Sequence, residues 1–172
     1  KLRPALGRLR QATSLDPNQS SYWNDLAWCA FELGRMDDAE AAVRRAIGLN
    51  DNSPSLQHTI GSVLLAQGDL AKAVVRLNRA VNADASSPLY HATLAACLAR
   101  LRDFETAREH LAEAVPPSRD FDNPWIWYHA GEAMQTMGDN EGAAKAFIQF
   151  LELHPGHPRE ADLRAYIKAH IE

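Results

Sequence analysis

The amino-acid sequence repeats itself about every 34 residues, and this period limits the chain to a small group of folds. Rows that begin at Ser20, Pro54, Pro88 and Pro124 lie 34, 34 and 36 residues apart. A period of this length is typical of chains built by stacking copies of one supersecondary unit. Six aligned columns keep a common character: Leu26/Ile60/Leu94/Ala130, Ala27/Gly61/Ala95/Gly131, Gly34/Gly68/Arg102/Gly138, Ala39/Ala73/Ala107/Ala143, Val43/Leu77/Leu111/Phe147 and Ala46/Ala80/Ala114/Phe150.

Each row reads as two helices joined by a tight turn. In the first row the apolar residues from Trp23 to Phe31 recur at spacings of three and four, which predicts one face of a helix. Gly34 is expected to end that helix in the left-handed conformation, and Ala39 to Ile47 predict the second helix. Three helix starts place a capping side chain before a proline: Ser53-Pro54, Ser87-Pro88 and Asn123-Pro124.

The small-residue columns explain how the helices pack. Alanine or glycine is needed where two helix backbones approach closely, and larger side chains fill the space beside that contact. A single helical hairpin cannot bury both of its faces, so the hairpins are expected to stack on one another.

This pattern resembles the tetratricopeptide repeat (TPR). The residues of the first row that carry the resemblance are, in order, Trp23, Leu26, Gly34, Ala39 and Ala46. The resemblance implies an all-α fold: a right-handed superhelical solenoid of antiparallel helix pairs, with about four and a half repeats and a capping helix. We expect one domain over residues 1–172, divided into a half repeat (1–19), full repeats (20–53, 54–87, 88–123 and 124–157) and the capping helix (158–172).

Two columns depart from the repeat pattern. Arg102 stands where the other rows have glycine, so a non-glycine residue is predicted in the left-handed region. Phe150 stands where the other rows have alanine, because the capping helix is expected to pack there instead of another repeat.

The chain begins part-way through a repeat and without methionine, so we expect it to be a fragment of a larger protein. Fourteen arginines against four lysines, together with abundant alanine, favour a bacterial source. The sequence does not fix the compartment, although the cytoplasm is favoured slightly over the periplasm.

Catalysis and metal binding have little support in the sequence. No nucleophile, base and orienting group occur in a recognisable order, so we predict no catalytic residues and no cofactor. His154 and His157 are three residues apart but have no third ligand nearby, and they are interpreted as part of a polar linker, with no metal site. Cys29 and Cys97 share a column two repeats apart, which places them too far from each other for a disulfide.

Composition excludes two kinds of partner. The net charge is −4, without long runs of like charge, so nucleic acid is not an expected ligand. No stretch approaches 18 consecutive apolar residues, so membrane insertion is not expected either.

The resemblance implies a binding groove lined by the first helix of each repeat. Residues at groove columns form the candidate site: Asn24, Asp25, Trp28, Phe31, His58, Ser62, Leu65, Arg100, Trp125, Tyr128, His129 and Glu132. The family's carboxylate clamp is missing, and so is its asparagine ladder, whose column holds Asp25, Thr59, Thr93 and His129 here.

The groove columns hold aromatic residues at both ends, and this has two readings. Trp28, Phe31, Trp125 and Tyr128 either pack between helices as structural residues or form an amphipathic site for an apolar helix or extended segment. The column of Trp28 also holds Ser62 and Glu132, which favours a position outside the deep core. The longer linker at 115–123 is either a spacer or a loop that brings Phe121 over the groove.

We therefore expect a non-catalytic scaffold that binds a protein or peptide partner of unknown identity. Two alternatives remain open at this stage. The chain is either a solenoid that assembles with copies of itself into a homo-oligomer, or a regulatory or docking domain of a larger enzyme.

Overall fold

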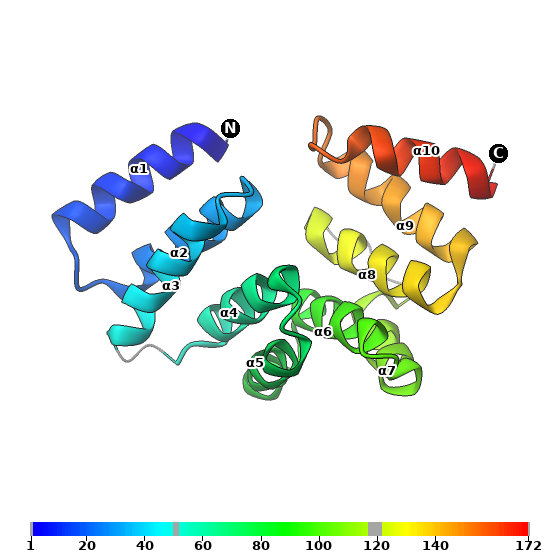
Figure 1. Cartoon of the computed structure of the whole chain (residues 1–172), viewed down its shortest axis with the longest axis horizontal. Coiled ribbons are helices and arrows are strands. Elements are labelled where there is room, and N and C mark those ends of the chain that lie inside the picture. The colour runs from blue at the N-terminus through cyan, green and yellow to red at the C-terminus, as the bar shows by residue number, and fades with distance from the viewer. Residues whose placement is uncertain (1, 50–51, 117–121, 172) are drawn as a thin grey trace. The chain divides into compact units, whose positions relative to one another are not determined.

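The computed structural model describes residues 2–49, 52–116 and 122–171, and within them every regular element is a helix. Ten helices follow one another along the chain (Figure 1), as the repeat pattern predicted. The chain divides into two compact units, an N-terminal unit (residues 1–84) and a C-terminal unit (residues 85–172). None of the helices in the described residues is long and apolar enough to span a membrane.

The N-terminal unit contains five helices: α1 (Leu2–Leu15), α2 (Ser20–Glu32), α3 (Met36–Gly48), α4 (Pro54–Gln67) and α5 (Leu70–Ala83). Within it α1 packs on α2, α2 pairs with α3, and α4 pairs with α5 while also contacting α2 and α3. Its core contains the predicted small column at Ala39, which is fully buried, with Leu26, Val43, Leu56 and Ile60 around it.

The C-terminal unit contains the other five helices: α6 (Pro88–Arg100), α7 (Phe104–Ala114), α8 (Pro124–Met137), α9 (Asn140–Leu153) and α10 (Glu160–Ile171). Here α6 pairs with α7 and packs on α8, α8 pairs with α9, and α10 packs on α9. Phe147, Phe150 and Leu151 of α9 form a core with Tyr128 of α8 and Leu163 of α10. Phe150 therefore belongs to the core that receives the capping helix, as its column predicted.

Paired helices are complementary in side-chain size at the glycines of the column Ala27/Gly61/Ala95/Gly131. A β-carbon placed on Gly61 would lie 2.6 Å from Cγ of Leu77, and one placed on Gly131 would lie 2.5 Å from a ring carbon of Phe147. Leu77 and Phe147 are both almost completely buried and have little room to move aside. Glycine is therefore required at these two positions by the close approach of the partner helix.

Helix starts agree with the sequence in part. Ser53 and Asn123 cap α4 and α8 by accepting hydrogen bonds from the backbone N–H groups of Leu56 and Trp125. Ser87 does not cap α6 with its side chain, so that prediction is wrong. The sequence reading missed a second set of caps, in which Asp69, Asp103 and Asp139 accept backbone hydrogen bonds at the starts of α5, α7 and α9.

The left-handed turn between paired helices is confirmed in all four rows, with φ of 69° at Gly34, 83° at Gly68, 87° at Gly138 and 68° at Arg102. Arg102 is the non-glycine residue with positive φ in the described part of the chain. Its guanidinium carbon lies 5.0 Å from the centre of the Phe104 ring. This cation–π contact offsets part of the backbone strain at an exposed turn.

Arg102→Gly is expected to raise the melting temperature slightly or leave it unchanged. The substitution removes a left-handed strain of about 1–2 kcal/mol but also removes a cation–π contact of about 0.5–1 kcal/mol. Arg102→Ala is the matched control, since it keeps the strain and loses the ring contact, and it should lower the melting temperature. Thermal unfolding by circular dichroism measures both. A clear drop for Arg102→Gly would show that the contact with Phe104 outweighs the strain.

Candidate functional site

The predicted residues of the N-terminal unit come together around Trp28. The Trp28 ring centre lies 5.5 Å from that of Phe31 and 5.3 Å from that of His58, which comes from α4. The Ser62 hydroxyl is 3.4 Å from Nε2 of His58, one turn earlier on the same helix. We call Trp28, Phe31 and His58 the N-terminal aromatic cluster.

Burial varies widely among these residues. Trp28 and Phe31 are partly buried, and Asp25 is exposed. His58, Ser62 and Leu65 are buried. Because Ser62 shares a column with Trp28, its burial corrects the expectation that this column lies outside the deep core. A serine tolerates this burial because its hydroxyl lies within hydrogen-bonding distance of the His58 imidazole.

Asn24, one turn before Trp28, is also buried. Its side-chain Oδ1 has no hydrogen-bond partner, although it is inaccessible to solvent. A buried amide oxygen without a donor is destabilising, and such groups are rare in folded proteins. Asn24 is therefore an acceptor that the structure leaves unused on the first helix of its repeat.

The predicted residues of the C-terminal unit form a larger cluster that includes histidines from outside α8. Trp125 and Tyr128 lie 5.5 Å apart between ring centres, and the Trp125 ring is 6.2 Å from that of His129. Phe150 stacks on His154 at 5.7 Å with an interplanar angle of 9°, and its centre is 5.0 Å from that of His157. We call these six residues the C-terminal aromatic cluster: Trp125, Tyr128, His129, Phe150, His154 and His157.

Tyr128 belongs to the core of its unit, since only 8% of it is exposed and it packs with Phe147 and Phe150. Of the two interpretations that the sequence leaves open for Tyr128, its burial favours a structural residue. Burial, together with the nearby Glu132 carboxylate, raises the pKa of the Tyr128 hydroxyl well above its ordinary value. Tyr128 therefore stays protonated and able to donate a hydrogen bond.

Glu132 accepts hydrogen bonds from three sides. Nδ1 of the buried His129 lies 3.3 Å from Oε2, and the Tyr128 hydroxyl also donates to this carboxylate. Arg159, from the segment that leads into α10, lies 3.4 Å from Oε1. Burial acts to raise the pKa of Glu132, but the hydrogen bonds from His129 and Tyr128 and the charge of Arg159 hold it below its ordinary value. Glu132 is therefore a carboxylate at neutral pH.

The bond to Glu132 also fixes the tautomer of His129. A carboxylate only accepts hydrogen bonds, so Nδ1 of His129 must carry the proton. Nε2 then carries a lone pair in the neutral ring, and it is buried without a hydrogen-bond partner. The imidazole thus serves to orient the carboxylate of Glu132.

Sequence reasoning missed Arg159, because this residue lies outside the repeat columns in which groove positions are recognised. It interpreted His154 and His157 as a polar linker, and the structure places both rings against Phe150 and Trp125. Burial, followed by the charges of His154 and Arg159, lowers the pKa of His157. Arg100, which the sequence also nominated, lies exposed at the end of α6.

Other nominated features contribute less to a site. Cys29 and Cys97 are buried thiols that are not joined by a disulfide. Phe121 and most of the linker at 115–123 lie outside the described residues. No group of three or more histidine, cysteine or acidic side chains gathers as metal ligands in the described parts of the chain.

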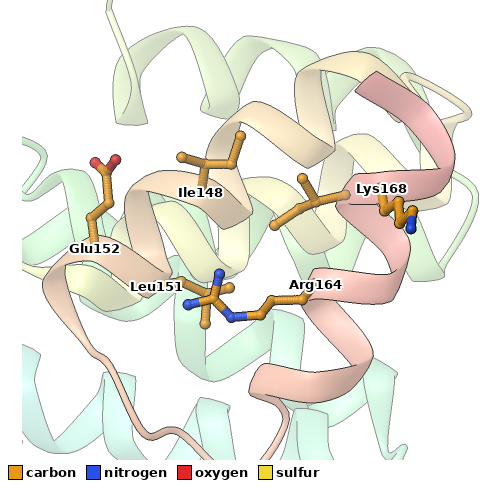
Figure 2. A pocket seen from close by; sticks show the side chains of 6 residues that line it. Ile148, Leu151, Glu152, Arg164 and Lys168 are labelled. Atoms are coloured by element: carbon orange, nitrogen blue, oxygen red, sulfur yellow. The ribbon is translucent and has the colours of Figure 1, made fainter. Parts of the chain in front are cut away.

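A separate pocket lies between α9 and α10, on other residues than the predicted site (Figure 2). It has a volume of about 470 Å³, with Ile148, Leu151 and Ile167 providing apolar surface and Arg164, Lys168 and Glu152 providing charge. Figure 2 shows Arg164 and Lys168 on α10 and the other labelled residues on α9. This pocket is a second concave surface of the C-terminal unit.

Comparison with known proteins connects this architecture to a family. A family model described as tetratricopeptide repeat matches residues 1–55 and 58–122, and another of the same description matches residues 126–157. No relative among the curated proteins matches the chain in sequence.

Several solved structures share the fold at low sequence identity. A thermophilic TPR protein of Thermus thermophilus is 19% identical, with a TM-score of 0.72 over 98% of this chain and 89% of its own. The Cut9–Hcn1 hetero-tetramer of APC/C contains a chain that is 21% identical, with a TM-score of 0.74 over 98% of this chain and 33% of that one. YrrB, described as a TPR protein with an unusual peptide-binding site, is 19% identical, with a TM-score of 0.57 over 98% of this chain and 84% of its own.

Proposed function

Because this chain belongs to the tetratricopeptide repeat family, we propose that it is a non-catalytic interaction module whose first helices bind a segment of a partner protein. Repeats of this family generally form protein-interaction scaffolds. The proposal assigns the contact to α2 and α4 in the N-terminal unit and to α6 and α8 in the C-terminal unit. The partner would be a peptide or helix with large apolar side chains, since aromatic residues dominate the candidate site.

The position of Trp28 carries this proposal. Trp28 lies on α2, where its neighbours Trp23 and Phe31 pack against the core of the N-terminal unit. Trp28 contacts Phe31 and His58 and remains partly exposed. A large aromatic side chain that neighbouring rings hold in place and that remains partly exposed is the kind of residue that dominates protein–protein binding energy.

Trp28→Ala is expected to weaken partner binding at least about ten-fold while the melting temperature changes little. Capture from the lysate of the source organism, followed by mass spectrometry, identifies the partner, and titration calorimetry with the purified partner measures the dissociation constant. Tyr22→Ala is the matched control, because Tyr22 is an aromatic residue of the same helix with 37% of its surface exposed and outside the predicted columns. It should leave binding unchanged.

Three outcomes would contradict the proposal. If a folded Trp28→Ala variant binds the partner with unchanged affinity, the binding surface lies elsewhere, for example at the pocket between α9 and α10. A large fall in melting temperature would show that Trp28 is a structural residue. If the captured protein is the chain itself, light scattering at several concentrations would identify self-assembly as the function.

A further inference from the structure

Arg159 places its guanidinium on two of the candidate binding residues of α8. It donates a hydrogen bond to the Tyr128 hydroxyl, and it lies 3.4 Å from Oε1 of Glu132. Its guanidinium carbon is also 5.7 Å from the centre of the Tyr128 ring. About half of the Arg159 side chain remains exposed, so solvent reaches this contact.

Tyr128 and Glu132 are held in place without help from Arg159. The Tyr128 ring is fixed in the core between Phe147 and Phe150, at 6.3 and 5.1 Å between ring centres. The Glu132 carboxylate is held by Nδ1 of His129 at 3.3 Å. A fixed carboxylate beside an aromatic ring recognises a planar guanidinium well, because it offers hydrogen-bond acceptors and a cation–π contact together.

Arg159 is not required to keep α10 on the C-terminal unit. Leu163 of α10 is buried in the core, with 3% of it exposed, and Tyr166 and Ile167 pack against the same core. The Tyr166 hydroxyl also donates to Oδ1 of Asn140 on α9 at 2.9 Å. The guanidinium can therefore leave Glu132 while the helix stays docked.

We propose that Tyr128 and Glu132 form a subsite for an arginine side chain of the partner, and that Arg159 occupies this subsite in the free protein. The proposal rests on the proposed function and specifies its chemistry: the partner segment carries an arginine next to apolar residues. Trp125, at 5.5 Å from Tyr128 between ring centres, supplies apolar surface beside the subsite. Arg159 then competes with the arginine of the partner for this subsite. The apparent affinity for the partner falls in proportion to the fraction of molecules in which the subsite is vacant.

The test uses N-acetyl-arginine methylamide as the probe and the full chain as the receptor. Binding is followed by NMR through the tryptophan indole signals, with Trp125 assigned by substitution. We expect Arg159→Ala to bind the probe with a dissociation constant in the millimolar range, at least five-fold tighter than the unmodified chain. Arg164→Ala is the matched control, since Arg164 pairs with Glu160 within α10, and it should bind like the unmodified chain.

A second probe and a double variant show whether the binding is specific. The citrulline counterpart of the probe, which has the same shape without the charge, should not bind Arg159→Ala. Adding Glu132→Gln to Arg159→Ala should abolish arginine binding. If Arg159→Ala does not fold, Arg159→Gln, which keeps the aliphatic stem, replaces it.

The inference is overturned if the vacated site binds the probe no better than the unmodified chain, or if it binds citrulline equally well. It is also overturned if the Glu132→Gln change leaves arginine binding intact. These failures are separable from failure of the proposed function, because the effect of Trp28→Ala on partner affinity is measured in the other unit and does not depend on the arginine probe.

Discussion

Phe150→Ala is expected to lower the free energy of unfolding by about 3–5 kcal/mol, the usual cost of removing a fully buried phenylalanine. Phe150 has no exposed surface, and its ring contacts Trp125, Tyr128, His154 and His157 at 5.0–5.8 Å between centres. The alanine at the same column of the other repeats cannot fill this space. Denaturation in urea, followed by circular dichroism, measures the loss.

The control for this prediction is Phe150→Leu, which keeps most of the volume and should cost clearly less. Since the removed ring also supports Trp125 and Tyr128, Phe150→Ala should weaken probe binding in the Arg159→Ala background as well. A loss of stability below about 1 kcal/mol would mean that neighbouring side chains collapse into the cavity.

Gly131→Ala is expected to lower the free energy of unfolding by up to about 2 kcal/mol, even though alanine favours helix more than glycine does. The new methyl group would lie 2.5 Å from the ring of Phe147, which is 1% exposed. Overpacking costs about 1–3 kcal/mol, and the gain in helix propensity of about 1 kcal/mol offsets only part of it. Gly7→Ala is the control, because a β-carbon on Gly7 meets nothing within 4 Å. It should stabilise the chain or leave it unchanged.

A second change isolates the cause. Row three of the repeat carries alanine and leucine at the columns of Gly131 and Phe147, as Ala95 and Leu111. Phe147→Leu should therefore be less harmful together with Gly131→Ala than alone, with a coupling free energy of about 1 kcal/mol or more in a double-mutant cycle. Strictly additive effects would show that the contact between these two residues is not the source of the loss.

Most of the fold was predictable from the sequence because the same pattern of residues recurs in each of the four rows. The agreement of four rows identified the helix pairs, the small column at Ala39 and the left-handed turn at Arg102. The predictions that were wrong concerned single residues that the repeat pattern does not constrain. Ser87 precedes a proline as Ser53 does, yet its side chain accepts no cap hydrogen bond, and the sequence holds nothing that separates the two.

The candidate site was less predictable, because a repeat column gives the face of a helix but not the depth of a side chain. Trp28 and Ser62 share a column, yet Trp28 is partly buried and Ser62 is 1% exposed. Tyr128 was nominated as a groove residue, but its burial beside Phe150 depends on packing that the column does not encode. Arg159 has no counterpart in any row, so only the fold brings it to Glu132.

The glycine contacts also determine how this chain can be recombined. The columns pair Gly61 with Leu77 and Gly131 with Phe147, whereas the other rows pair alanine with Val43 or Leu111. A helix exchanged alone between the first and the fourth row would therefore meet a partner of the wrong size. Phe147 would clash with Ala27, and Val43 would leave a void against Gly131. A hairpin exchanged whole carries its own matched pair with it. The smallest interchangeable part of this protein is thus the pair of helices, and gene shuffling that cuts at the turn inside a pair would disrupt the contact that both helices need.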